Sequence, residues 1–259
     1  MADVRKANEF CWINMLTPDP AAAKEFFSAV LGWSYREMPG MGWVIQAGGD
    51  DMGGLFDLNG PNTPPGARAV IGVMVKTDNA DASADRVRAL GGKAQPPMDI
   101  GPNGRMVVVH DPSGANIDLW QAKMERPSVD PHAHGSMSWF ENSTLDAAQG
   151  REFYTKLFGW TSETMPMPEF EYTVFSYNGV PIAGMHPMTP EMKSGGMKPQ
   201  WATYFTVNDV DAAFATGMER GAREMIAPMD IPNIGRMAAM TSPQGVNFYV
   251  ITYLARPSS

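Results

Sequence analysis

The sequence repeats itself, and this repeat constrains the fold more than any other feature. Residues 12–33 align with residues 139–160 at an offset of 127, with eight of 22 positions identical. Residues 97–120 align with residues 228–251 at an offset of 131, with ten of 24 identical. Such agreement, with only small insertions between the blocks, is far above chance. Both halves of the chain are therefore predicted to adopt the same fold.

The repeat also suggests where the domains begin and end. A chain of 259 residues suits one large domain or two modest ones, at roughly 150 residues per domain, and the repeat favours two. We expect a first domain over residues 1–124 and a second over residues 135–259. The segment between them, residues 125–134, contains proline, serine and histidine and is interpreted as a linker.

Each half opens with the signals of a strand followed by a helix. Residues 10–16 predict a strand, with Phe10, Trp12, Asn14 and Leu16 on one face and Cys11, Ile13 and Met15 on the other. Asp19 is placed to cap the helix that follows, and Gly32 is placed to end it in a left-handed conformation. The second half repeats these two signals at Asp146 and Gly159.

The same order of elements recurs later in each half. In the first half, residues 69–75 predict a strand, residues 81–90 a helix, and residues 105–110 and 115–120 two further strands. The last two are joined by Asp-Pro-Ser-Gly at 111–114, which is typical of a tight turn. Each half therefore reads βαβββ twice, which gives four βαβββ units and an α+β fold.

Three short motifs, together with this order of elements, carry a resemblance to a known family. They are Glu-Phe-Phe at 25–27, Leu-Gly-Trp at 31–33, and the hairpin Asp-Pro-Ser-Gly-Ala-Asn-Ile-Asp-Leu at 111–119. The chain resembles the vicinal-oxygen-chelate superfamily of glyoxalases, bleomycin-resistance proteins and extradiol dioxygenases, and especially bacterial proteins with two fused glyoxalase-like domains. The resemblance implies two tandem domains with curled mixed sheets. It also implies a function among isomerases, lyases, dioxygenases and binding proteins.

The resemblance also implies positions for a metal site. In metal-using members a His or Gln on the first strand of a unit and a Glu on its last strand bind the ion. The residues at the corresponding positions are Trp12, Trp139, Asp118, Tyr249, Ile71 or Gly72, and Ala202. An indole nitrogen only donates hydrogen bonds, and one carboxylate does not make a divalent site. We therefore expect no metal ligands and no cofactor, with a divalent metal as the alternative.

The histidines and the single cysteine are further candidates for chemistry. His132 and His134 form a His-x-His pair in the linker, which either faces solvent or holds zinc where two more ligands converge. His110 and His186 are alternative catalytic bases, the latter in a loop rich in methionine and proline. Cys11 has no basic neighbour in sequence, so no nucleophilic role is expected.

Aromatic and polar residues that share a strand face indicate a small-molecule site. The predicted lining residues are Trp12, Asn14 and Asp118 in the first half, and Trp139, Glu141 and Tyr249 in the second. Indole rings of this kind favour planar or partly apolar ligands. The alternative is that both tryptophans are ordinary core residues. Asn14 and Glu141 favour the first interpretation, because a polar side chain buried without a partner is costly.

Two arginines complete the set of candidate ligand-binding residues. Arg105 and Arg236 each stand in a Gly-Arg-Met triplet, six residues after Asp99 and Asp230. Their guanidinium groups are suited to a bidentate grip on an anionic group of the ligand. The alternative, which we favour, is a structural ion pair with the preceding aspartate.

Two classes of function follow from these residues. The first is a protein that binds a small, partly apolar or aromatic molecule in a concave cleft, without metal. The second is a lyase, isomerase or dioxygenase-type enzyme with Glu141, Asp118 or Tyr249 as acid or base, or with metal ligands at other positions. The two halves differ in their polar groups, with Asn14 against Glu141 and Asp118 against Tyr249, which favours an enzyme. The residues at the expected metal-ligand positions favour a binding protein without metal.

Charge and composition bound the partners. The net charge of −8 argues against nucleic acid, which needs clustered Lys and Arg. No signal peptide or membrane-spanning run is visible, so a cytoplasmic protein is expected. We expect a small-molecule ligand and no membrane. Two fused domains predict an intramolecular pseudo-dimer with clefts at or near the interface, in a chain that is a monomer or a homodimer.

Overall fold

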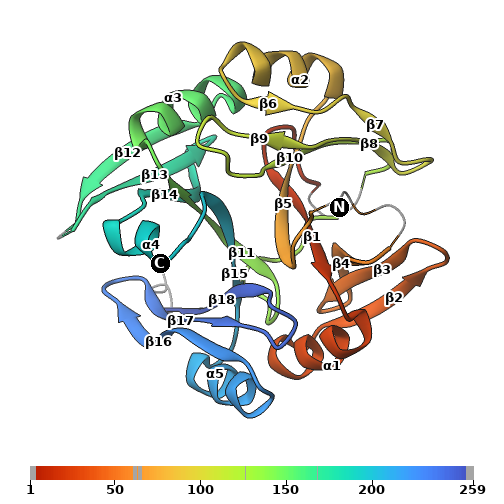
Figure 1. The fold of residues 1–259 in the computed structure, drawn as a ribbon, viewed down its shortest axis with the longest axis vertical. Helices are drawn as coiled ribbons and strands as arrows, with labels where there is room; N and C mark the ends of the chain where they lie inside the picture. Colours follow the sequence, from red (N-terminus) through yellow and green to blue (C-terminus); the bar gives the residue numbers. More distant parts are fainter. Residues whose placement is uncertain (1–3, 61–62, 64–65, 126, 168, 255–259) are drawn as a thin grey trace. The chain divides into compact units, whose positions relative to one another are not determined.

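The fold consists of short helices and mixed β-sheets (Figure 1). The computed structural model describes residues 4–60, 63, 66–125, 127–167 and 169–254. The helices are α1 (Pro20–Leu31), α2 (Ala80–Ala89), α3 (Ala147–Phe158), α4 (Pro190–Ser194) and α5 (Val210–Glu219). The strands of the first half are β1 (Phe10–Thr17), β2 (Ser34–Met38), β3 (Gly42–Ala47), β4 (Asp50–Asp57), β5 (Val70–Lys76), β6 (Lys93–Ala94), β7 (Met98–Asp99), β8 (Gly104–Val107), β9 (Val109–His110) and β10 (Asp118–Ala122). Those of the second are β11 (Met137–Thr144), β12 (Thr161–Pro166), β13 (Glu171–Tyr177), β14 (Val180–Pro187), β15 (Gln200–Thr206), β16 (Arg223–Ile231), β17 (Gly235–Thr241) and β18 (Asn247–Tyr253).

Each half of the chain supplies one eight-stranded sheet. The strand order is β2-β3-β4-β1-β5-β10-β8-β7 in the first half and β12-β13-β14-β11-β15-β18-β17-β16 in the second. Both sheets are mixed. In the first, β4 pairs parallel with β1 and antiparallel with β3; in the second, β14 pairs parallel with β11 and antiparallel with β13. The α+β class and the tandem arrangement are therefore confirmed. We call the four βαβββ units modules, numbered in chain order: β1–β4, β5–β10, β11–β14 and β15–β18.

The predicted helix ends are confirmed where the repeat is strongest. The Asp19 side chain accepts the Ala22 N–H at the start of α1, and Asp146 does the same for Gln149 at the start of α3. Both helices end at a left-handed glycine, Gly32 with φ of 67° and Gly159 with φ of 69°. The local signals alone therefore place these helices.

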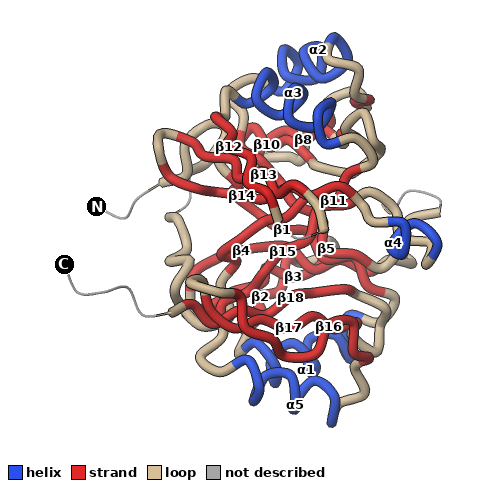
Figure 2. Tube along the Cα trace, turned by 90° about the vertical axis from the view of Figure 1, so that its left-hand side faces the viewer, coloured by secondary structure: helices blue, strands red, loops and turns tan. Residues whose placement is uncertain are grey.

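Two compact lobes are distinguished by the contacts within the chain. The first lobe comprises residues 1–12, 72–128 and 139–202, and the second comprises residues 13–71, 129–138 and 203–259. Each lobe thus combines most of one module from each half. Helices α2 and α3 lie side by side in the first lobe, and α1 and α5 lie side by side in the second (Figures 1 and 2). The expected domain boundaries at 124 and 135 stay a prediction.

Aromatic rings dominate the core of each lobe. In the first, Phe10 stacks on Phe140 with ring centroids 3.9 Å apart, and Tyr154 lies against Trp160 and Trp201. In the second, the buried rings are those of Phe26, Phe27, Trp33, Phe205 and Phe248. Buried rings of this size contribute strongly to stability.

The segment interpreted as a linker is in part packed into the second lobe. Val129 is buried. The Nδ1 atom of His134 accepts the Asn208 N–H at 3.2 Å. This nitrogen therefore serves as a hydrogen-bond acceptor. Among the described residues, no helix is long and apolar enough to cross a membrane.

Candidate functional site

Strand β11 divides its side chains between a buried face and a half-exposed one. Phe140 and Asn142 are buried on one face, whereas Trp139 and Glu141 are half-buried on the other. This alternation follows from the two-residue period of a strand. Trp139 is therefore not an ordinary core residue, and the predicted pair of Trp139 and Glu141 does share a face.

A tyrosine from the neighbouring part of the sheet connects this pair. The Tyr172 hydroxyl on β13 donates to Glu141 Oε2 at 2.8 Å, and it accepts the indole N–H of Trp139 at 3.2 Å. Gly184 on β14 makes room for it, because a Cβ atom there would lie 1.8 Å from the tyrosine oxygen. The result is a chain of hydrogen bonds from an indole through a phenol to a carboxylate.

His186 extends the same cluster, and the expectation that it lies in a loop is wrong. It lies on β14 beside Ser143 of β11, and both side chains are buried. Its Nε2 atom is 3.0 Å from Ser143 Oγ and 3.7 Å from Glu141 Oε1. Its Nδ1 atom is 3.1 Å from the Pro187 carbonyl oxygen. Because a carbonyl oxygen only accepts, this contact requires that Nδ1 carry a proton.

The equivalent face of the first half has different residues. Trp12 and Asn14 are half-buried there, while Ile13 and Met15 on the opposite face of β1 are fully buried. Trp12 is therefore not part of the core either. The strand β4 places the ring of Phe56 beside this face, next to Leu16 in the strand register.

Asp118 is the most enclosed of the candidate acids. It lies on β10 with only 8% of its surface exposed. Its carboxylate accepts the amide of Asn116 at 2.8 Å and the Val109 N–H at 3.4 Å. Burial raises the pKa of Asp118 to about 6, and these hydrogen bonds oppose the rise only in part. The group therefore changes its charge close to neutral pH.

Tyr249 lies in the second lobe, where its ring packs on that of Tyr204 with centroids 4.8 Å apart. The two residues are direct neighbours on the parallel strands β15 and β18. Asn247, earlier on the same strand, accepts the Thr241 hydroxyl at 2.8 Å. Tyr249 is nearly buried.

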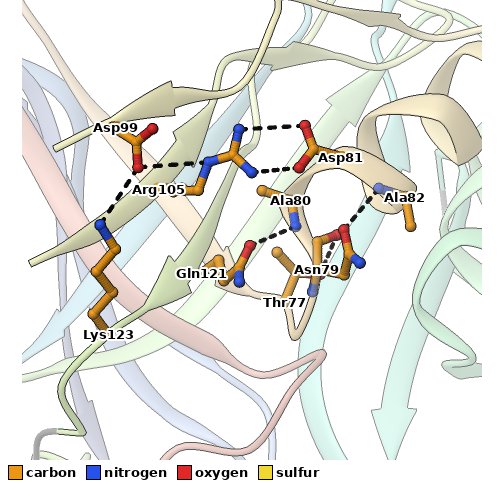
Figure 3. A network of polar contacts seen from close by, with 9 residues as sticks. All are labelled: Thr77, Asn79, Ala80, Asp81, Ala82, Asp99, Arg105, Gln121 and Lys123. Carbon is orange, nitrogen blue, oxygen red and sulfur yellow. Dashed lines mark hydrogen bonds and ion pairs between the residues drawn. The ribbon is translucent and has the colours of Figure 1, made fainter.

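Both arginines are held by two carboxylates each. Arg105 contacts Asp81 at the start of α2 and has Asp99 3.7 Å from its Nε atom (Figure 3). Arg236 makes the corresponding contacts with Asp211 and Asp230, at 2.7 and 2.9 Å. Asp211, hydrogen-bonded to Arg236, has a lowered pKa. These contacts agree with the structural alternative, and each arginine joins a helix start to its sheet.

The remaining candidates lie apart from the cluster on β11. Cys11 donates its thiol to the Met74 carbonyl at 3.5 Å, and burial raises its pKa to about 12. Such a thiol stays protonated and unreactive at neutral pH. His110 lies on β9, paired with Lys93 of β6.

Tyr172 was not identified by the sequence reasoning, whereas His186 was considered there as an alternative catalytic base in a loop. His186 was assigned to that loop, although it lies on the strand β14. The prolines and glycine of β14 conceal that strand pattern, and Tyr172 becomes visible only through the glycine opposite it.

Comparison with known proteins identifies relatives along nearly the whole chain. The sequence profile of the Glyoxalase/Bleomycin resistance protein/Dioxygenase superfamily matches residues 10–119 and 138–250. A putative glyoxylase of Mycobacterium tuberculosis, CFP32, is 31% identical over 93% of this chain and 93% of its own length. The anthracycline biosynthesis protein DnrV of Streptomyces peucetius is 29% identical over 93% of this chain and 91% of its own.

Solved structures share the fold at low sequence identity. A Mn(II)-bound glyoxalase from Novosphingobium aromaticivorans aligns with a TM-score of 0.67 and 15% identity, over 98% of this chain and 84% of its own. The 2,2',3-trihydroxybiphenyl 1,2-dioxygenase of Sphingomonas wittichii aligns with a TM-score of 0.67 and 13% identity, over 95% and 91%. These similarities extend to the architecture of both halves.

The residues of this chain do not fit a divalent metal such as the Mn(II) of the Novosphingobium glyoxalase. At the expected ligand positions Trp139 donates its N–H to Tyr172, and Asp118 accepts two hydrogen bonds from its own half. Among the residues that the structure describes, no three His, Cys, Asp or Glu side chains are grouped to hold an ion. An indole supplies no lone pair for a cation.

Proposed function

Because this chain belongs to the Glyoxalase/Bleomycin resistance protein/Dioxygenase superfamily, we propose that it binds a small, partly aromatic molecule in a concave cleft without a metal. The observation that carries the proposal is the cluster of Trp139, Tyr172 and Glu141 on one half-exposed strand face. Large rings beside a few oriented polar groups are the usual composition of a small-molecule site. The name of the Streptomyces relative, an anthracycline biosynthesis protein, supports an aromatic ligand.

The experiment is a thermal-shift and calorimetry screen of planar aromatic and dicarbonyl compounds, on protein freed of metal by a chelator. A ligand at a hundred times its Kd adds about 2.7 kcal/mol, which raises the Tm of a chain this size by several degrees. Trp139→Ala is expected to weaken the hits at least tenfold, with exposed Glu163→Ala as the control. The proposal is contradicted if the affinity of the bound compounds is unchanged in Trp139→Ala, or if their binding requires a stoichiometric metal.

A second function is supported by the position of His186. Nε2 lies 3.7 Å from Glu141 Oε1, so the cluster brings an imidazole and a carboxylate together, two groups that serve metal-independent acid–base catalysis. The test is mass spectrometry of each bound compound after incubation without metal. A converted product whose rate at saturating compound falls by about 100-fold or more in Glu141→Gln identifies an enzyme. Unchanged ligands identify a binding protein.

A further inference from the structure

The first and third modules present the same strand face with different side chains. In the first, Asn14 lies beside Gly54 and Leu16 beside Phe56. In the third, Glu141 lies beside Gly184 and Ser143 beside His186. The matching registers make Asn14 equivalent to Glu141, Leu16 to Ser143, and Phe56 to His186.

In each of these two modules a glycine leaves room for one aromatic ring on this face: Gly54 on β4 in the first and Gly184 on β14 in the third. In the first module the Phe56 ring occupies that room, since a Cβ atom on Gly54 would lie 2.5 Å from its edge. In the third module the Tyr172 hydroxyl occupies it. The equivalent backbone thus carries an apolar ring in the first module and a hydrogen-bonding phenol in the third.

The polar face presents acceptors. Glu141 offers carboxylate oxygens, one of which accepts from Tyr172 at 2.8 Å. Nε2 of His186 lies beside it, 3.7 Å from Glu141 Oε1, and is itself 3.0 Å from Ser143 Oγ. A site with a carboxylate acceptor next to an indole ring selects a ligand that donates, because an acceptor left without a donor weakens binding.

We infer that the ligand is a planar ring carrying a hydroxyl group that donates to Glu141, and that one such ligand binds per chain, on the face of β11, β13 and β14. This inference rests on the proposed function. Tyr172 determines the specificity, because its hydroxyl fixes the carboxylate. The carboxylate also disfavours an ionised hydroxyl, so the ligand binds in its protonated form.

The test compares 4-nitrophenol with 4-nitroanisole, in which a methyl group replaces the hydroxyl proton and removes the donor. Calorimetry is expected to show one site per chain and about tenfold tighter binding of the phenol, as for one hydrogen bond to a charged group. Bound phenol is expected to lose the yellow absorbance of its ionised form. Glu141→Gln should reduce the preference to about threefold or less, while Glu171→Gln, an exposed neighbour of Tyr172 on the same strand, should leave it unchanged.

The outcomes separate the two proposals. Equal binding of both probes that Glu141→Gln does not alter overturns the inference and leaves aromatic binding intact. Two equivalent phenol sites per chain also overturn it. Failure of every aromatic compound to bind the full-length protein overturns the proposed function, and the inference with it.

Discussion

The two lobes use different interactions at equivalent positions of the repeat. In the first, the Tyr154 hydroxyl donates to Asp111 Oδ2 at 2.7 Å and accepts the Trp201 indole N–H at 2.8 Å, all three being buried. The positions equivalent to Tyr154 and Asp111 in the second lobe are Phe27 and Ser242. Tyrosine and aspartate in one lobe thus correspond to phenylalanine and serine in the other.

This difference shows that one backbone can be held by hydrogen bonds or by ring packing. The ring of Phe27 lies 5.1 Å from those of Trp33 and Phe248, so its contribution is apolar contact. Asp111 instead needs a donor from a distant segment, because a buried carboxylate without one is strongly destabilising. The first lobe therefore depends on a particular partner residue, and the second on shape and volume.

The largest effect is expected where packing alone acts. Phe27→Ala removes a fully buried ring and should lower the free energy of unfolding by about 4 kcal/mol, with little dependence on pH. Urea unfolding between pH 5 and 8 measures it. Phe56→Ala, at a half-exposed ring, is the matched control and should cost less than half as much. Equal costs would show that Phe27 does not hold the second lobe.

A smaller and pH-dependent effect is expected in the first lobe. Tyr154→Phe keeps the ring but leaves Asp111 without its hydroxyl donor, at a cost of about 3 kcal/mol. Burial already raises the pKa of Asp111, and the Tyr154 hydrogen bond opposes that rise. Its loss raises the pKa further, so the cost should grow as pH rises and shrink as the carboxyl becomes protonated.

The second lobe supplies a control for this variant. Adding Asp111→Ser to Tyr154→Phe recreates the second lobe's pair of residues and should recover at least 1 kcal/mol, because no carboxylate is then buried. Costs that add without recovery, or that do not change between pH 5 and 8, would show that the hydrogen bond does not support the first lobe.

Local signals predicted much of the fold and less of its packing. Asp19, Gly32, Asp146 and Gly159 act within a few residues of themselves, so the sequence reveals them directly. The composition of the lobes depends on contacts between distant residues instead. Tyr154 is 43 residues from Asp111, and no local pattern announces that pair.

The candidate site shows the same limit. Alternation predicted that Trp139 and Glu141 share a face, but the third ring of the cluster enters through a gap left by Gly184. His186 was placed in a loop because Pro181 and Pro187 resemble loop residues, although both stand near the ends of a strand. Prolines are tolerated at strand ends, where no ladder N–H is required.

Asp118 is expected to make the stability of the first half depend on pH, whereas the second half has Tyr249 at the equivalent position. The folded pKa of Asp118, about 6 against 3.8 when unperturbed, means that the folded chain binds this proton more tightly than the unfolded chain. Its contribution to stability is therefore greatest below about pH 4 and falls as pH rises to 6, by about 3 kcal/mol.

The variant Asp118→Asn isolates this contribution. It should match the parent protein near pH 4 and exceed it in stability by up to about 3 kcal/mol at pH 7, as measured by urea unfolding at each pH. The exposed Asp50→Asn should follow the parent at every pH. A constant difference across the range would mean that Asp118 has no raised pKa in the folded chain.

The smallest effects separate the two strand faces most cleanly. Gly184→Ala places a methyl group where the Tyr172 hydroxyl lies, and Gly54→Ala places one against the Phe56 ring. Both should cost about 1–3 kcal/mol of stability by overpacking. Only Gly184→Ala also moves the donor that orients Glu141, so it alone should weaken 4-nitrophenol binding, by about tenfold. If Gly54→Ala weakens the phenol equally, the two faces act as one site, and the difference between their side chains carries no selectivity.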